Sequence, residues 1–328
     1  MSYKPIIIVA GEPSSIFFEI FFKAIKKYKA KNPLILIASI KLIQLQIKYF
    51  KIRKKVRAIN YNDLYKIKLN NSRINVIDVE YVPSAIFEKS SIKTNRYIDE
   101  CFKIAFKILK TKKIYKFING PIEKNIFLKK KYLGITEYIS HNFSVKQKAM
   151  LIYNKKLSVC PLTTHLPLKS VAKNINRSNI VEKIKLINNF YKKNFNKIPK
   201  IAVLGLNPHC ESVEKFNEDE KIVRPTISYL KKLNYKVSGP YSADTMFIKK
   251  NRDKFDVILG MYHDQVLTPI KTLFEYDAIN ITLGLPFLRI SPDHGPNKQM
   301  IGKNRSNPLS LIRAISFLDK NWLKQKKV

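Results

Sequence analysis

The chain has 328 residues, 45% of them hydrophobic, so it is long enough for two domains or one large α/β unit with a substantial core. Its 62 lysines and arginines against 24 aspartates and glutamates give a net charge of +38, which favours anionic ligands. Because lysine is spread over the whole chain, with no nucleic-acid motif and no basic block interleaved with aromatic residues, the charge indicates no specific nucleic-acid partner.

Only three cysteines occur, and their wide spacing argues against a disulfide framework or a C-x-x-C metal site. This pattern favours a reducing cytoplasm. The first apolar run, Ile6 to Ala10, is too short for a signal peptide or a membrane span, so we expect neither.

Strand and helix signals alternate along the first half of the chain. Short β-branched or apolar runs predict strands at 6–10, 34–39, 74–79 and 114–118. Apolar residues spaced by three and four predict helices over 16–28 and 97–109, the first of them capped by Ser14 or Ser15. Between strand 114–118 and the next element, Gly120-Pro121 marks a sharp turn.

The second half continues the same alternation. Strands are predicted at 149–153, 157–161, 201–204, 257–259, 278–283 and 287–290; helices are predicted over 179–195, 218–233 and 309–318. The class is therefore α/β with mainly parallel strand pairing. Neither a G-x-G-x-x-G fingerprint nor a P-loop occurs, so a standard Rossmann dinucleotide site is not indicated.

Polar side chains interrupt the strands between Phe255 and Gly295 at their ends. The residues concerned are Tyr262, His263, Asp264, Gln265, Lys271, Asn280, Thr282 and Arg289. In α/β sheets ligands bind outside the carboxyl ends of strands. A metal ligand, a carboxylate, two cations and an amide together suit a phosphorylated, metal-chelating substrate, whereas each residue alone is better explained as a buried histidine or a solvated charge.

Three of the five histidines, His165, His209 and His263, follow predicted strands in polar, proline-bearing turns. Their wide spacing cannot come from one helix but fits three strand ends that converge. Three imidazoles with open positions suit Zn²⁺, Co²⁺ or a similar ion, although spacing alone does not establish a metal site. We expect His141 at the surface, and His294 either as a loop cap or as a ligand contact.

Asp244 and Asp264 are candidates for a general base or for orienting a histidine. The alternative is that they cap helices and form turns, as aspartate commonly does. Thr163 and Thr164, beside His165, have a similar alternative, since their hydroxyls can simply bond the backbone.

Nine motifs in chain order resemble the 4-hydroxythreonine-4-phosphate dehydrogenase family. They are Gly11-Glu12-Pro13, Asn119 to Ile122, Gly134 to Glu137, Thr163-Thr164-His165, Gly205 to His209, Ala243-Asp244-Thr245, Tyr262 to Gln265, Asn280 to Pro286 and Asp293-His294-Gly295. The most specific of them are Tyr-His-Asp-Gln and the Thr-Leu-Gly-Leu-Pro that follows it. The resemblance spans nearly the whole chain.

This resemblance implies a two-lobed α/β/α fold like that of isocitrate and isopropylmalate dehydrogenases, with the active site in the cleft between the lobes. The expected first lobe comprises about 1–140 plus the C-terminal helix, 303–328, and the second comprises 141–302. The resemblance also implies a cytoplasmic homodimer with a shared active site and no membrane or specific nucleic-acid partner.

Site residues are carried over by position. His165, His209 and His263 inherit the binding of one divalent metal, with Zn, Mg and Co as the candidates. The expected substrate contacts are Thr136, Lys271, Asn280 and Arg289, and the expected catalytic residues are Asp244, Asp264 and Lys271. NAD or NADP is the implied oxidant, with Asp293, His294 and Gly295 near it.

The implied reaction is oxidation of 4-phosphooxy-L-threonine at its 3-hydroxyl to a β-keto acid, which decarboxylates to 3-amino-2-oxopropyl phosphate in pyridoxal phosphate biosynthesis. A metal acidifies the chelated hydroxyl and polarises the new carbonyl. Lysine and arginine suit the phosphate, arginine in a bidentate manner.

The chain departs from the family pattern at several loops. Ile135 stands where the family has a histidine before Thr136; Ser14 to Phe17, Cys210 to Val213 and Pro296-Asn297 replace residues that include several glycines. Fewer glycines restrict how closely a ligand approaches the backbone. Two alternatives therefore stay open: a paralogue acting on phospho-threonate or phospho-erythronate, and a catalytically inactive metal-binding homologue.

Overall fold

The computed structural model describes residues 4–88, 90–123, 127–128, 132, 134–213, 216–292 and 295–320. The chain divides into two compact units. Unit 1 comprises Met1–Ser144 and Leu285–Lys320, and unit 2 comprises Val145–Gly284. Within the described part of the chain, no helix is both long and apolar enough to cross a membrane.

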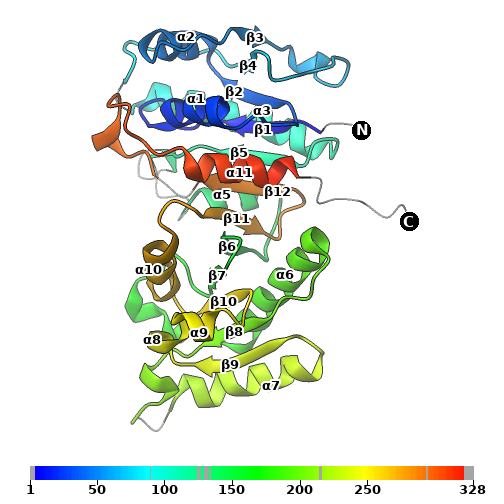
Figure 1. Cartoon of the computed structure of the whole chain (residues 1–328), viewed down its shortest axis with the longest axis vertical. Coiled ribbons are helices and arrows are strands. Elements are labelled where there is room, and N and C mark those ends of the chain that lie inside the picture. Colours follow the sequence, from blue (N-terminus) through cyan, green and yellow to red (C-terminus); the bar gives the residue numbers. More distant parts are fainter. Residues whose placement is uncertain are drawn as a thin grey trace. The chain divides into compact units, whose positions relative to one another are not determined.

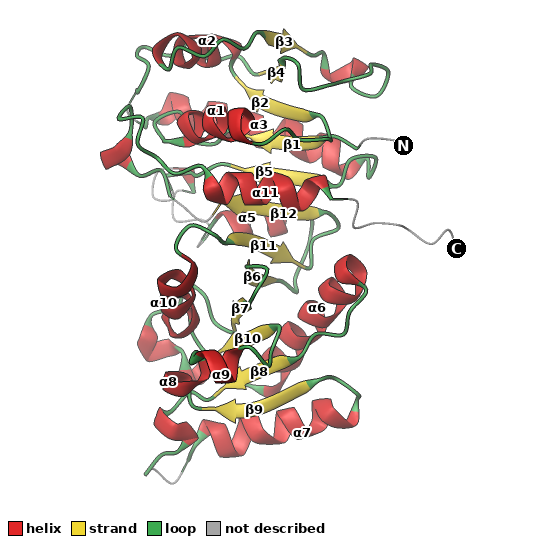
Figure 2. Cartoon of the chain, viewed as in Figure 1, coloured by secondary structure: helices red, strands yellow, loops and turns green. Residues whose placement is uncertain are grey.

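Unit 1 contains a six-stranded run of sheet in the order β3-β4-β2-β1-β5-β12, and its pairings are parallel (Figures 1 and 2). The strands are β1 (Ile6–Val9), β2 (Leu34–Ala38), β3 (Val56–Ala58), β4 (Ile74–Asp78), β5 (Lys116–Asn119) and β12 (Leu288–Pro292). The central strands are buried, which explains why they read as continuous β-branched runs rather than as alternating ones.

Helices cover both faces of this part of the sheet. They are α1 (Phe17–Lys27), α2 (Ile40–Tyr49), α3 (Ile92–Lys110), α5 (Ile135–Asn142) and α11 (Leu309–Asp319). α1 packs against α11, and α3 packs against β1 and β2. Figure 1 draws α1 and α11 in front of the strands and α3 behind them. The core between these layers is therefore built from the apolar stripes that predicted α1, α3 and α11.

Unit 2 contains the strand order β11-β6-β7-β10-β8-β9. Its strands are β6 (Ala149–Tyr153), β7 (Ser158–Pro161), β8 (Ile201–Leu204), β9 (Val237–Tyr241), β10 (Val257–Gly260) and β11 (Ile279–Leu283). β7, β10, β8 and β9 are parallel, whereas β6 pairs antiparallel with both β7 and β11. Pairing is thus mainly parallel, as predicted.

The helices of unit 2 are α6 (Arg177–Phe195), α7 (Arg224–Lys232), α8 (Ala243–Met246), α9 (Lys249–Arg252) and α10 (His263–Phe274). A π-helical turn, Asp219–Val223, precedes α7. α6 packs on β6 and β11 and also against α7, while α10 packs on β7 and β10. A buried cluster that includes Val159, Leu204, Ile258, Val266 and Ile270 joins α10 to the sheet.

The predicted α/β class is confirmed. The division into units differs from the predicted lobes for residues 285–302, which belong to unit 1. The reason is β12, which pairs in parallel with β5 and so joins the sheet of unit 1. The sequence analysis assigned no element to α2, β3, α5 or α10.

Candidate active site

Three neighbouring parallel strands of unit 2 lead directly to the three candidate metal ligands. β10 lies between β7 and β8 and pairs in parallel with both, so their carboxyl ends share one edge. His165 follows β7, His209 follows β8 and His263 follows β10. The predicted placement of all three histidines after strand ends is therefore what the fold has.

Hydrogen bonds tie these three loops to one another. Thr163, after β7, donates from Oγ1 to the Met261 carbonyl at 2.7 Å. Gln265 accepts from the Met261 backbone N–H at 2.7 Å and donates from Nε2 to the Gly205 carbonyl, after β8, at 2.8 Å. Thr163 thus bonds the backbone, which was one of its two expected roles, and together with Gln265, to which the sequence analysis gave no such role, it links the three loops.

Asp219 fixes the loop that carries His209. Its carboxylate, which is completely buried, accepts from the backbone N–H groups of Leu206 at 2.7 Å and Asn207 at 2.9 Å. The Asn207 amide donates to the same carboxylate at 3.1 Å. Because three donors compensate the buried charge, Asp219 holds this loop firmly. Sequence reasoning missed it, since an aspartate inside a predicted helix gives no sign of a backbone partner.

The structure brings two of the three histidines together. The ring centroids of His165 and His263 are 5.8 Å apart. His263 does not lie in a turn as predicted; it is the first residue of α10, with Tyr262 as N-cap. Its Nδ1 lies 2.6 Å from Oδ1 of Asp264, so this contact fixes the ring and leaves Nε2 for a ligand.

His209 lies close to Asp244. It occupies a left-handed backbone conformation with φ of 56°. Asp244 is the second residue of α8 (Ala243–Met246), is exposed, and accepts from Ser242 Oγ at 2.6 Å. This hydrogen bond lowers the pKa of Asp244, and the charge of His209 lowers it further. Asp244 is therefore a carboxylate near neutral pH.

Across the ranges that the structure describes, no three His, Cys, Asp or Glu side chains are gathered closely enough to hold a metal ion. The side chains of His165, His209 and His263 are nevertheless of a type that can bind a metal ion. Two of the imidazoles are neighbours, one of them oriented by a carboxylate, and all three project from one sheet edge. Three imidazoles, one of them oriented by a carboxylate, are a donor set that suits zinc and related ions.

Lys271 and Asn280 lie elsewhere in unit 2. Lys271 is in the last turn of α10 and exposed, not directly after a strand. Asn280 is the second residue of β11, and its buried Oδ1 has no hydrogen-bond partner. A buried acceptor without a partner carries a desolvation cost, which a ligand donor would remove.

In unit 1 two of the predicted substrate contacts, Arg289 and Thr136, are in contact with each other. Arg289, on β12, is only 1% exposed. Its Nε donates to Asn119 Oδ1 at 2.8 Å, and its Nη1 donates to Thr136 Oγ1 at 3.1 Å. Burial lowers the pKa of Arg289 to about 10, so the guanidinium remains charged at neutral pH. Asn119, at the end of β5, is a member of this group that the sequence analysis did not single out.

Ile135 opens α5, whose N-cap is Gly134. The next residues are Thr136, which holds Arg289, and Glu137, whose charge acts on Arg289. Ile135 itself is only partly buried and offers no donor or acceptor. The departure from the family pattern therefore falls directly beside the arginine group.

The carboxyl ends of β1 and β5 approach each other closely. A Cβ at Gly120 would lie 2.0 Å from the Ala10 carbonyl oxygen, and one at Gly11 would lie 2.3 Å from the Pro121 oxygen. Glu12, which follows, is 1% exposed, and burial raises its pKa. β1 lies between β2 and β5, so strand order reverses here, and such switch points bind ligands in open α/β sheets.

The residues expected near the nicotinamide cofactor are only partly described. Asp293 and His294 lie outside the described residues, whereas Gly295 is exposed. A Cβ built at Gly295 would meet no atom within 4 Å, so there is open space beside it.

Known proteins match this chain over nearly its full length. The chain is 36% identical over 317 residues to a 4-hydroxythreonine-4-phosphate dehydrogenase of Sulfurihydrogenibium sp., with 94% of this chain and 96% of the relative covered. It is 31% identical over 220 residues to a D-threonate 4-phosphate dehydrogenase of Pectobacterium atrosepticum, with 66% of this chain and 68% of the relative covered.

A crystal structure of 4-hydroxythreonine-4-phosphate dehydrogenase from Klebsiella pneumoniae superposes with a TM-score of 0.80 at 26% identity, covering 96% of this chain and 98% of that one. Residues 29–318 match the family model described as pyridoxal phosphate biosynthetic protein PdxA. The chain, with its histidine-bearing strand ends and its Arg289 group, therefore belongs to the PdxA family of pyridoxal phosphate biosynthetic proteins.

Proposed function

We propose that the chain is a dehydrogenase that oxidises 4-phosphooxy-L-threonine at its 3-hydroxyl, with NAD or NADP as oxidant. The hydroxyl loses its proton and the carbon-bound hydrogen leaves as hydride to the cofactor. The β-keto acid formed loses CO₂ and gives 3-amino-2-oxopropyl phosphate. The observation that carries the proposal is the arrangement of His165, His209 and His263 after three neighbouring parallel strands, in a chain of the PdxA family.

The three histidines are the proposed ligands of one divalent ion, with zinc, magnesium and cobalt as the candidates. Such an ion, when bound, would acidify the substrate hydroxyl and polarise the new carbonyl. Asp264 supports this role, because its contact with Nδ1 of His263 leaves Nε2 directed away for a ligand. Thr163 and Gln265 hold the three loops in register.

The proposed contacts to the anionic parts of the substrate are Thr136, Lys271, Asn280 and Arg289. Arg289 is held by Asn119 and Thr136, so its planar guanidinium is preorganised. Asn280 offers a buried acceptor. Asp244, Asp264 and Lys271 are the candidates for proton transfer; Asp244 is exposed and ionised, its lowered pKa makes it a weaker base, and Asp264 is already engaged with His263.

For the cofactor we propose the carboxyl edge of unit 1, where β1 and β5 form the switch point. Asp293, His294 and Gly295, the residues first expected near NAD, follow β12 on the same sheet. We further propose a cytoplasmic homodimer with a shared active site. Sedimentation would test the assembly, and mixing two inactive variants with changes at different site residues should restore activity; a fully active monomer would contradict it.

The alternative substrate is D-threonate 4-phosphate, the substrate in the name of the Pectobacterium relative. Ile135 keeps this alternative open, because it offers no hydrogen-bond donor beside Thr136 and Arg289, where the family has a histidine. Phospho-erythronate would be an analogous substrate, and an inactive metal-binding homologue remains the non-enzymatic alternative.

A substrate panel tests these assignments. Phosphorylated threonine, D-threonate and erythronate are each incubated with NAD or NADP, with and without EDTA, while reduced cofactor is measured. Turnover of phosphorylated threonine that EDTA abolishes is the expected result. Turnover of D-threonate 4-phosphate alone would favour the alternative, and no turnover by a metal-loaded protein would favour the inactive homologue.

Single alanine variants test the ligands. His165→Ala, His209→Ala and His263→Ala should each lose the metal on dialysis, measured by elemental analysis. His141→Ala is the matched control, because His141 is an exposed histidine on α5. Metal retention by all three ligand variants would contradict the proposed site, whatever the activity.

A further inference from the structure

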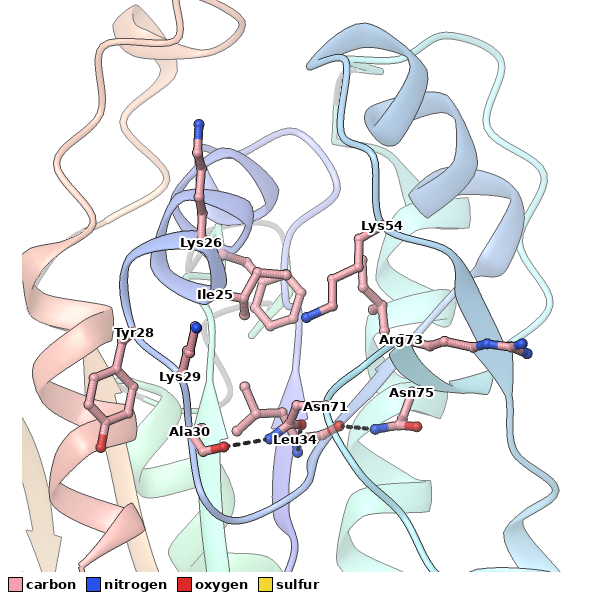
Figure 3. A pocket seen from close by; sticks show the side chains of 12 residues that line it. Ile25, Lys26, Tyr28, Lys29, Ala30, Leu34, Lys54, Asn71, Arg73 and Asn75 are labelled. Atoms are coloured by element: carbon pink, nitrogen blue, oxygen red, sulfur yellow. Dashed lines mark hydrogen bonds between the residues drawn. The ribbon is translucent and has the colours of Figure 1, made fainter.

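A cavity of about 320 Å³ opens in unit 1 between the last turns of α1 and the starts of β2 and β4 (Figure 3). Residues that line it include Phe21, Ile25, Leu34, Lys54, Ile74 and Asn75. Leu34 and Ile74 are the first residues of β2 and β4, so the cavity lies at the amino edge of the sheet. Asn119 ends β5, so the Arg289 group belongs to the opposite, carboxyl edge.

The lining of this cavity is apolar on one side. Phe21, Leu34 and Ile74 are buried parts of the core, and Ile25 is half-buried on the outer side of α1. Small-molecule sites have this character: mainly apolar walls with a few polar groups that fix orientation, in volumes from about 300 Å³ upward. The cavity therefore has room for one or two aromatic rings or a branched apolar group.

The cavity is built on a rigid frame. Asn71 accepts from the Leu34 backbone N–H at 2.9 Å and donates to the Ala30 and Asn32 carbonyls, both at 2.9 Å. Asn75, 2% exposed, donates to the Leu34 carbonyl at 3.1 Å, and its own Oδ1 is buried with no hydrogen-bond partner. The two asparagines thus pin the loop before β2 to the start of β4, and the walls are preformed.

Lys54, from the loop between α2 and β3, supplies a charge inside this space. Figure 3 shows its ammonium directed toward the middle of the cavity, on the side of Ile25, whereas the Arg73 guanidinium points away. Burial lowers the pKa of Lys54. No acidic residue lines the cavity, and no ion pair or hydrogen bond of Lys54 occurs among the residues that the structure describes.

We propose that this cavity binds a small amphipathic anion: a carboxylate, sulfonate or phosphate ester on an aromatic or branched apolar body. The anionic group would lie on Lys54, with Lys29 at the rim, and the apolar body would pack on Phe21, Ile25 and Ile74. A ligand of this kind removes the cost of a partly desolvated ammonium and covers apolar surface at the same time. The excess of lysine over the whole chain explains neither the apolar walls nor the inward direction of Lys54.

The test uses the full chain and two dyes that share one ring system. 1-Anilinonaphthalene-8-sulfonate carries the anion, and N-phenyl-1-naphthylamine lacks it. Fluorescence titration should show saturable binding of the sulfonate and at least about tenfold weaker binding of the neutral dye, the range expected for one charge-assisted hydrogen bond. Equal binding of both dyes would overturn the role of Lys54, and displacement by millimolar sulfate would overturn the role of the apolar walls.

Variants locate the binding. Lys54→Met should weaken the binding of the sulfonate dye about tenfold or more, whereas Lys54→Arg should keep the wild-type affinity. Ile25→Trp should prevent binding of the dye, because the larger side chain fills the cavity from the half-exposed face of α1. Lys107→Met is the matched control, because it removes an equal charge from an exposed position on α3. The site is not this cavity if Lys54→Met and Ile25→Trp both bind the sulfonate dye with wild-type affinity. The same conclusion follows if Lys107→Met lowers the affinity for the dye as much as Lys54→Met does. None of these readouts depends on the proposed dehydrogenase activity.

Discussion

Arg289 and Lys116 are two buried cations on the neighbouring strands β12 and β5, and their surroundings differ. Arg289 donates to Asn119 and Thr136. Lys116, 2% exposed, has a buried ammonium with no hydrogen-bond partner among the residues that the structure describes. A buried charge that is held by polar groups is characteristic of a binding site, whereas an unsolvated ammonium costs stability. The two residues therefore call for different experiments.

Arg289→Lys keeps the positive charge but loses the planar fork that Asn119 and Thr136 hold. We expect kcat/KM for the phosphorylated substrate to fall by about tenfold or more, because a charge-assisted hydrogen bond is worth roughly 1.5–3 kcal/mol. Steady-state kinetics measure the effect, and thermal unfolding shows whether the fold is retained. Arg53→Lys, at an exposed position, is the control. An unchanged kcat/KM would remove Arg289 from the site.

Lys116→Met should stabilise the protein at neutral pH. Burial lowers the pKa of Lys116 to about 8, against 10.5 for a free lysine. The unfolded chain thus binds more protons between these two values, and the stability of the wild type rises with pH over that window. Below about pH 8 the full penalty remains, on the order of 3 kcal/mol for such a shift.

The measurement is urea unfolding of wild type and Lys116→Met from pH 7 to 10.5. The difference in the free energy of unfolding between Lys116→Met and wild type should be largest at pH 7 and should decrease as pH rises. Lys107→Met, which removes an exposed lysine, should show no such trend. A constant difference across the series would mean that packing, not ionisation, separates the two proteins.

At the scale of elements, α10 and the loops after β7, β8 and β10 act as one assembly. Thr163 joins the first loop to Met261, and Gln265, on α10, joins Met261 to Gly205. Three elements distant in sequence are thus fixed by two side chains. Precise positioning of ligands by such supporting hydrogen bonds is what gives a metal site its affinity.

Gln265→Met should lower metal affinity without removing a ligand. Methionine fills a similar volume but neither accepts from Met261 nor donates to Gly205, so the loops lose their link. Loss of a supporting contact typically costs about 10- to 100-fold in metal affinity. Titration calorimetry with zinc measures this, with Thr272→Ala, an exposed position on the same helix, as the control. Wild-type affinity in Gln265→Met would show that the link is structural only.

The helices and strands that were predicted correctly are those whose apolar residues follow one clear pattern along the sequence. Buried parallel strands such as β1 and β10 read as apolar runs, and α3 and α6 show spacing by three and four. α2 was missed because Ile43, Leu45 and Ile47 alternate with glutamines, which is the pattern of a strand. α10 was missed because its first turn is polar and Pro269 lies inside it. In both helices tertiary packing prevails over the local signal.

The residues of the candidate site also fall into those that could be predicted from the sequence and those that could not. The placement of the three histidines after strands was predictable, because polar residues beside strand ends are visible in a sequence; Arg289 was expected at the end of a strand and lies inside β12 instead. Asp219 and Asn119 were not predictable, because their importance lies in partners that only the fold reveals: backbone N–H groups of a distant loop for Asp219 and the guanidinium of Arg289 for Asn119. Sequence patterns identify candidate ligands, whereas the residues that hold them depend on the folded backbone.

At the scale of the whole molecule the dominant property is the net charge of +38. Among the residues that the structure describes, acidic residues such as Glu19 and Glu220 pair with only a small share of the lysines and arginines. A surface with this excess attracts anions over distances comparable to the Debye length, about 10 Å at 0.1 M salt. The proposed substrate carries both a phosphate and a carboxylate, so its approach should depend on salt.

We therefore expect kcat/KM to fall severalfold between about 20 mM and 500 mM potassium chloride, with kcat nearly unchanged, because screening weakens capture rather than chemistry. Competition by chloride in the phosphate site would lower kcat/KM in a similar way. Screening and competition can be distinguished by changing the anion of the salt. Screening depends on ionic strength alone, so chloride and acetate at equal ionic strength should act equally. A difference between them would point to occupation of the site. A kcat/KM that stays constant over this range with both salts would show that long-range attraction has no part in substrate capture.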